Sequence, residues 1–235
     1  MNPNEIAAKF QANRVTNPGQ SEILRQTLYD FQLYATAGVT TLTFFSLPQG
    51  QGITSAIGAT VGTAKTSADT NMELAGQLPS GKSFLIESIE VLFFPGTVNT
   101  ANTYTTAPPI EFAAAAAATV EAGTTDVNTI YQSGVLELNI LSKNYLRETP
   151  LLRFPPRAHF DLAAAVASNS ATVGQITLAT LRAGGRAYYI EPEIPIAPAM
   201  NFEVKILFPG AVATPSGFNG RIGVILDGYL LRASQ

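Results

Sequence analysis

The residues best suited to catalysis are few and lie close together in the chain. The single histidine, His159, stands two positions before Asp161. A hydrolytic triad needs a serine, a carboxylate and a histidine that carries the proton. No Gly-x-Ser-x-Gly segment, which would present the serine on a sharp turn, accompanies this histidine. The sequence therefore predicts a packed or surface histidine and no catalytic residue.

The chain has few of the residues that bind metal ions or cofactors. Zinc sites use several cysteines and histidines, and the chain has no cysteine and one histidine. Calcium held by loop oxygens stays open, although no EF-hand spacing occurs. The segment "GATVGTAKT" at residues 58–66 lacks the adjacent Gly-Lys of a phosphate-binding loop. We expect no metal site, no cofactor and no cofactor-binding residue.

Two pairs of acidic residues have the residue types of a glycosidase, Glu87 with Glu90 and Glu191 with Glu193. Glycosidases use two carboxylates at a defined separation in space, which a sequence does not give. Solvated carboxylates on strand faces explain the same spacing. A carbohydrate-active enzyme on a jelly-roll fold is therefore kept as an alternative, and we expect no enzyme.

The charge content points towards assembly. Charged residues make up 13% of the chain, against roughly 25% in ordinary soluble domains. The net charge is −3, and no segment collects a surplus of Lys and Arg. Because strong binding to nucleic acid needs clustered Lys and Arg near phosphates, we expect no strong direct nucleic-acid binding. A surface so poor in charge favours contact with other subunits; a tolerant surface rich in Thr, Ser and Asn is the alternative.

Residues 1–36 are predicted to form a helical N-terminal arm. Ser21 can cap a helix in which Leu24, Leu28 and Phe31 follow one another at i, i+4 and i+7. This apolar stripe needs a surface to lie against, either the core of the protein itself or a neighbouring subunit. The start of the chain lacks the apolar core of a signal peptide, so export by the standard route is not expected.

Residues 37–235 are predicted to form a single β-sandwich domain. Two segments, "SFLIESIEVLFFPG" at 83–96 and "NFEVKILFPG" at 201–210, alternate polar and apolar residues and close on Phe-Pro-Gly. We expect both to be core strands, and the imperfect alternation of the first is compatible with a bulge. The residues expected in the core are Phe84, Phe202, Val204, Ile206 and Phe208. About eight antiparallel strands with turn signals and long loops favour a jelly roll.

Long Ala- and Thr-rich loop insertions are predicted near residues 97–130 and 157–174. The alanine run at 113–118 favours a short helix, and the Ala-rich stretch at 161–174 is a candidate partner for it. Small side chains permit close approach between neighbours, so both insertions are expected to be covered by other subunits. The candidate subunit contacts are Leu24, Leu28, Phe31, Ala113, Ala116 and Ala164.

The style of strands and turns in residues 37–235 resembles the jelly-roll capsid proteins of tailless icosahedral bacteriophages. The resemblance rests on "GVTTLTFFSLP", "NMELAGQLPSGKSFLIESIEVLFFPG", "AYYIEPEIPIAPAMNFEVKILFPG" and the closing "GRIGVILDGYLLRASQ". It implies a virion shell protein, made in the host cytoplasm, that assembles with other copies of itself without cofactor or catalysis. Other capsid proteins or an internal membrane would be further partners. A vertex, fibre or decoration protein that binds a host receptor or glycan is the alternative.

Overall fold

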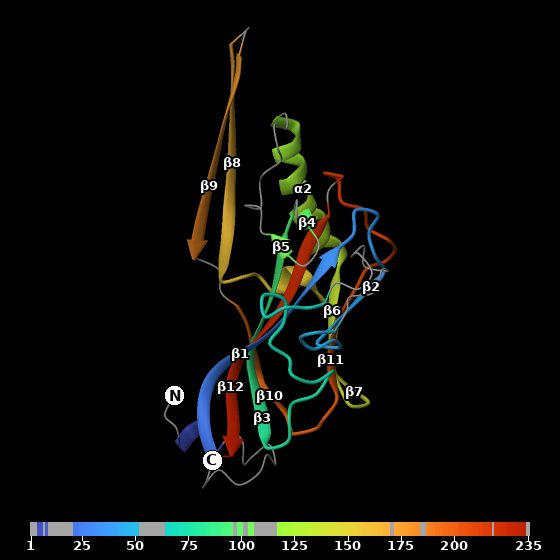
Figure 1. The fold of residues 1–235 in the computed structure, drawn as a ribbon, viewed down its shortest axis with the longest axis vertical. Coiled ribbons are helices and arrows are strands. Elements are labelled where there is room, and N and C mark those ends of the chain that lie inside the picture. The colour runs from blue at the N-terminus through green and yellow to red at the C-terminus, as the bar shows by residue number, and fades with distance from the viewer. Residues whose placement is uncertain are drawn as a thin grey trace.

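The computed structural model describes residues 4–6, 8, 21–51, 64–95, 98–100, 103–105, 117–169, 172–183, 187–217 and 219–233. Most of the molecule is built from strands (Figure 1). In chain order the elements are β1 (Ser21–Tyr34), β2 (Thr41–Phe44), β3 (Lys82–Phe94), β4 (Val98–Thr100), β5 (Thr103–Thr105), α2 (Ala117–Ser133), β6 (Val135–Ile140), β7 (Lys143–Pro150), β8 (Ala158–Asn169), β9 (Thr172–Ala183), β10 (Tyr188–Ile196), β11 (Phe202–Leu207) and β12 (Gly220–Ala233).

Eight of these strands form two four-stranded antiparallel sheets. Sheet one has the order β1-β12-β3-β10, and sheet two has the order β2-β11-β6-β7. Buried side chains of both sheets form one hydrophobic cluster, in which Phe84 and Ile89 of sheet one join Phe44 and Val204 of sheet two. The expectation of an all-β protein is confirmed.

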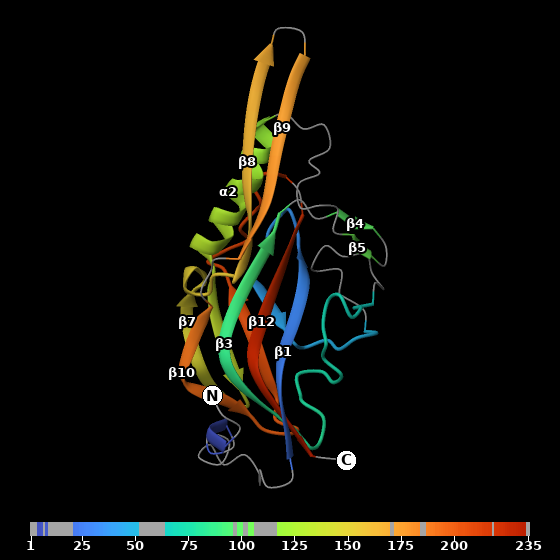
Figure 2. The ribbon, with the colours of Figure 1, turned by 90° about the vertical axis from the view of Figure 1, so that its left-hand side faces the viewer.

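The pairing of the eight strands is nested along the chain. The first pairs with the last, β1 with β12, and inside that pair lie β2 with β11, β3 with β10 and β6 with β7. Successive pairs belong alternately to sheet one and sheet two. The chain is therefore a single antiparallel ribbon, folded back at β6 and β7 and rolled into two layers. The start of β1 and the end of β12 lie together at one end of the molecule (Figure 2).

The two related sequence segments occupy corresponding places in the two sheets. β3 lies between β12 and β10, and β11 lies between β2 and β6, so each is an inner strand. The five residues expected in the core, Phe84, Phe202, Val204, Ile206 and Phe208, are all at most 7% exposed. The prediction of two core strands is confirmed, with one strand in each sheet.

β3 carries a β-bulge where it pairs with β12. The register passes from Ser88 opposite Asp227 to Ile86 opposite Gly228, so Glu87 is the extra residue. The bulge explains the imperfect alternation of this segment, because it shifts by one position the residues that face the core. Those residues are Phe84 and Ile86 before the bulge and Ile89, Val91 and Phe93 after it.

The predicted N-terminal helix over residues 21–34 is wrong, because these residues form β1 at the edge of sheet one. Leu24 and Leu28 are four positions apart and share a face of a strand as well as of a helix, whereas Phe31 belongs to the opposite face. The two-residue alternation is obscured because Asp30 and Gln32, on the core side of β1, are polar and buried.

The described start of the predicted arm packs on its own subunit. Residues 4–6 and 8 are helical. Ile6 is buried against Leu85 and Leu231, which belong to the face of sheet one that points away from sheet two. The part of the arm that the structure describes is thus a core strand and a short helical segment laid against the sandwich.

Asp30 and Gln32 connect β1 to β2 in the other sheet. The backbone N–H of Phe45, next to β2, donates to Asp30 Oδ2 at 2.6 Å, and Gln32 donates from Nε2 to the carbonyl oxygen of Thr43. Lys65 forms a buried ion pair with Asp30. Burial raises the pKa of Asp30, against the opposing effects of the Lys65 charge and of hydrogen bonds from Lys65, Phe45 and Thr70.

Part of the free edge of β1 is covered by residues 65–72. The backbone N–H of Phe31 donates to the carbonyl oxygen of Asp69 at 2.7 Å. The backbone N–H of Tyr29 donates to Asn71 Oδ1 at 3.0 Å. These bonds satisfy edge groups that would otherwise be free to pair with another chain.

The remaining elements stand outside the two sheets. β4, β5 and α2 lie between β3 and β6 in the chain, and β8 and β9 lie between β7 and β10. β8 and β9 pair from Ala158 opposite Ala183 to Asn169 opposite Thr172. This β8–β9 hairpin projects beyond the sheets, at the end opposite the start of β1 and the end of β12 (Figures 1 and 2). α2 lies beside β8.

Replacing Gly228 tests the close approach at the bulge. A Cβ at this position would lie 1.9 Å from the carbonyl oxygen of Leu85, so Gly228→Ala must separate β12 from β3. We expect a loss of about 2 kcal/mol in the free energy of unfolding, in the range of overpacked sites, measured by urea denaturation. Gly210→Ala is the matched control, because a Cβ there meets nothing within 4 Å. Equal stability of the two variants would contradict the bulge geometry.

Candidate functional site

The β8–β9 hairpin begins directly after Arg157, which is held on the outer face of sheet one. Its backbone N–H donates to Glu90 Oε2 at 2.9 Å, and its Nη2 donates to Ser88 Oγ at 2.7 Å. The guanidinium also forms ion pairs with Glu90 at 2.8 Å and with Asp227 at 2.7 Å. These contacts fix the first foot of the hairpin to β3 and β12.

Asp227 is the centre of this ionic network, and its side chain is 9% exposed. Thr27 Oγ1 donates to Asp227 Oδ1 at 3.0 Å, and Arg25 Nη2 donates to Oδ2 at 3.0 Å. Arg25 also reaches Glu87, the extra residue of the bulge, through an ion pair of 3.0 Å. One carboxylate therefore joins β1, the bulge of β3 and Arg157 at the foot of the hairpin.

The environment of Asp227 keeps its carboxylate ionised. Burial acts to raise the pKa, but the hydrogen bonds from Thr27 and Arg25 and the positive charges of Arg157 and Arg25 outweigh it. The pKa of Asp227 is consequently held below its ordinary value. A carboxylate saturated by two guanidinium groups is suited to holding strands together, because it neither gives nor takes a proton near neutral pH.

The second foot of the hairpin is fixed by packing. Ala187 is 4% exposed, and the next residue, Tyr188, pairs with Ile89 of β3. The ring of Tyr188 meets that of Phe154 edge to face at a centroid distance of 5.0 Å. The guanidinium of Arg153 lies 5.5 Å from the Tyr188 ring centre. Both ends of the hairpin are therefore attached to the sandwich.

The C-terminal half of α2 is anchored beside the same network. Ile130 is fully buried, and the Tyr131 hydroxyl donates to the carbonyl oxygen of Val91 at 2.5 Å. Burial, with a further contribution from the charge of Glu90, raises the pKa of Tyr131. Asp126 accepts a hydrogen bond from the backbone N–H of Ser216 at 2.8 Å. The helix is thus held to the sandwich by both apolar and polar contacts.

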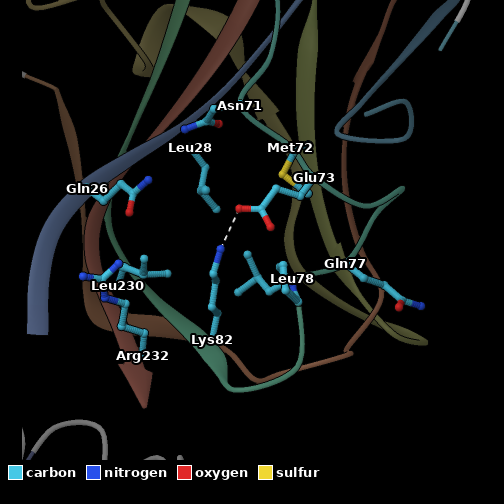
Figure 3. A pocket seen from close by; sticks show the side chains of 11 residues that line it. Gln26, Leu28, Asn71, Met72, Glu73, Gln77, Leu78, Lys82, Leu230 and Arg232 are labelled. Atoms are coloured by element: carbon cyan, nitrogen blue, oxygen red, sulfur yellow. Dashed lines mark hydrogen bonds and ion pairs between the residues drawn. The ribbon is translucent and has the colours of Figure 1, made fainter. Parts of the chain in front are cut away.

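A hollow of about 260 Å³ opens between sheet one and residues 71–79, at the end of the sandwich opposite the hairpin (Figure 3). Its lining includes Leu28 and Leu230 from sheet one and Leu78 from the segment before β3. Lys82 and Glu73 form an ion pair of 2.6 Å at this hollow. The volume lies below the roughly 300–1,000 Å³ of small-molecule pockets. Lys82 is paired with Glu73, and Arg232, which also lines the hollow, is paired with Glu22, so the hollow offers little to a ligand.

The residues singled out from the sequence are distributed over different parts of the molecule. Leu28 is buried in the core of its own subunit, and Leu24 and Phe31 are half-buried in β1. Ala164 lies in β8, opposite Thr177, whereas Ala113 and Ala116 fall outside the described residues. Leu28 is therefore a core residue of its own subunit.

The acidic residues and the histidine considered for catalysis lie in three strands, β3, β8 and β10. Glu87 and Glu90 both belong to the ionic network, and each is paired with an arginine. His159 lies in β8, opposite Arg182. Glu191 and Glu193 lie in β10 at the edge of sheet one.

The sequence analysis missed the two residues at the centre of the network. Arg157 and Asp227 are 70 positions apart and meet because β12 pairs with β3. A signal existed for Asp227, since it is the one charged residue in the apolar run from Val224 to Leu231. A charge placed inside a strand of this kind indicates a partner on the same face.

Removing the charge of Asp227 should destabilise the fold in a pH-dependent way. Its folded pKa is depressed, so its contribution is present above the unfolded pKa of about 3.9 and is lost as the pH falls through the lower folded value. We expect Asp227→Asn to lose about 2 kcal/mol of unfolding free energy near pH 7, and the difference from the wild type to shrink below about pH 4.

Urea denaturation at several pH values measures this difference. Glu203→Gln is the control, because Glu203 is 36% exposed and pairs on the surface with Lys205, where an ion pair contributes little. A wild type and an Asp227→Asn variant of equal stability at pH 7 would show that the network is not stabilising.

The described residues were also inspected for metal sites and membrane-spanning helices, and the chain was compared with known proteins. Among the described residues, no three His, Cys, Asp or Glu side chains are grouped so that they could hold a metal ion. No helix in the described part of the chain combines the length and the apolar character needed to span a membrane. Searches against family models, curated proteins and solved structures gave no match to this chain.

Proposed function

We propose that this chain is a jelly-roll subunit of a virus shell, which assembles with other copies of itself. The observation that carries the proposal is the nested pairing of the eight strands, first with last and so inwards, divided alternately between two facing sheets. A ribbon rolled in this way is the arrangement of a double-sheet jelly roll, an architecture of viral capsid and lectin domains among others. A fold alone does not determine a function, so the proposal also needs support from the charges and contacts of the protein.

The distribution of charge supports a subunit rather than a free monomer. The chain is only 13% charged, and several of its charges are used internally. The buried charged residues include Asp30, Lys65, Asp69, Glu90, Asp126, Arg221 and Asp227. The surface is thereby left with still fewer charges than the composition suggests, which fits a protein whose sides meet neighbouring copies.

The ionic network supports a structural role over an enzymatic one. The carboxylates of Glu87, Glu90 and Asp227 each form an ion pair with Arg25 or Arg157, at distances of 2.7–3.0 Å. Carboxylates paired in this way position strands and the foot of the hairpin. The partners that we propose are other copies of this chain, with other capsid proteins or an internal membrane as further partners in the virion.

Assembly of the purified protein tests the proposed function. We expect shell-like particles by electron microscopy and a large species by light scattering at neutral pH. Because the contacts are proposed to be apolar, raising the salt from about 0.1 M to about 1 M should leave the particles intact, whereas contacts between exposed charges would be screened. A protein that stays monomeric at high concentration and binds glycans would instead favour the vertex or fibre alternative.

A further inference from the structure

The β8–β9 hairpin is the longer of the two hairpins that pair with no other strand within the described residues; the other is β4 with β5. Within the described residues, β8 and β9 pair only with each other and form a separate two-stranded sheet. Each strand of such a ribbon leaves one row of N–H and C=O groups pointing outwards. A two-stranded hairpin alone is marginally stable in water. We therefore expect the β8–β9 hairpin, which projects beyond the sandwich, to be stabilised by a binding partner.

The sequence of the hairpin narrows the chemistry of that partner. Residues 162–181 contain no Asp, Glu, Lys, Arg or His. The register pairs Leu162 with Ala179 and Ala163 with Leu178, and successive residues of a strand belong to opposite faces. Apolar residue types therefore occupy register positions on both faces. Residues 162–181 therefore offer no cation to bind phosphates, and His159 and Arg182 lie only at the foot of the hairpin, which argues against nucleic acid and anionic lipid headgroups.

The open backbone argues against insertion into a lipid core. In hydrocarbon, each unsatisfied N–H or C=O costs several kcal/mol, so open sheet edges do not occur there. The partner must offer backbone groups of its own, which means another strand. Another copy of the same hairpin does so, and it matches the uncharged surface residue for residue.

The size of the hairpin fits a stable contact. Edge-to-edge pairing places one strand of 12 residues from each copy at the contact, which is longer than the usual strand of about 5–6 residues and provides a long ladder of backbone hydrogen bonds. The feet of the hairpin are already fixed by Arg157 and Tyr188, so less orientational freedom is lost when the hairpin binds.

We propose that the β8–β9 hairpins of two copies of this chain pair edge to edge and form a continuous four-stranded sheet across the contact. This inference rests on the proposed function, because it names the element that joins subunits within the shell. A two-fold axis relates the two hairpins, so each presents the same edge to the other.

Spin labels report the contact directly. The chain has no cysteine, so Ala165→Cys gives a single labelling site in β8, and Asn144→Cys, exposed on β7, gives a control site on the sandwich. In the assembled protein we expect labels at position 165 to lie within about 20 Å of each other, since strands in a sheet are about 4.8 Å apart, and labels at position 144 to lie farther apart. Position-165 labels beyond that distance would overturn the pairing.

Two variants test whether the hairpin is needed for assembly. Replacing residues 159–182 with a short Gly-Ser linker should leave cooperative unfolding of the sandwich intact and abolish particles. Ala163→Lys combined with Ala165→Lys should do the same, because lysines on an edge strand oppose its pairing with a strand of another chain. Deletion of residues 98–105, which hold the three-residue strands β4 and β5, is the control. Normal assembly of either hairpin variant overturns the inference, as does hairpin-dependent flotation with liposomes.

The outcomes separate the inference from the function on which it rests. Discrete dimers with close labels at position 165, but no shells, would support the pairing and contradict the shell proposal. Shells with distant labels would contradict the pairing and leave the shell proposal standing.

Discussion

The pairing of β1 with β12 is the constraint on which the rest of the structure depends. It joins the first and last strands of the sandwich along the whole of β1, and β12 in turn holds β3 at the centre of sheet one. Every other pair must then nest inside this one. Such long-range contacts form slowly and late, so the sandwich is complete only when the C-terminal strand is in place. The insertions leave at the ends of the strands, where their length does not disturb the register.

The buried ion pairs of this fold join elements that are far apart in the sequence. Asp30 and Lys65 tie β1 to the segment that covers its edge, and Asp227 with Arg157 ties the hairpin foot to sheet one. Buried ion pairs contribute little net stability compared with apolar packing, but breaking one is costly because a charge is left unpaired. The network therefore specifies where the hairpin foot sits more than it adds to the stability of the core.

The core strands could be predicted from sequence because the alternation of core-facing apolar residues is visible within each strand itself. In β11 the alternation from Phe202 to Phe208 is unbroken, and in β3 it is interrupted once, by the bulge. β1 was mistaken for a helix because Asp30 and Gln32 place polar residues on its core side, where their partners come from distant segments. The Ala-rich stretch at 161–174 is predicted as an insertion. Alanine favours a helix locally, and the strand conformation of residues 161–169 depends on pairing with residues 172–180. The meeting of Arg157 with Asp227 depends on the β3–β12 register, which no local pattern shows.

The proposed two-fold contact between hairpins cannot by itself build a closed shell. A two-fold contact between hairpins joins copies in pairs and is then exhausted, because both partners use the same surface. A closed shell needs at least one further kind of contact that leads from one pair to the next. The sides of the sandwich are the candidates, since α2 and the hairpin gather at one end while the start of β1 and the end of β12 lie at the other (Figure 2). Under the proposed shell function, the hairpins set the pairs and the sides of the sandwich join pairs into a lattice.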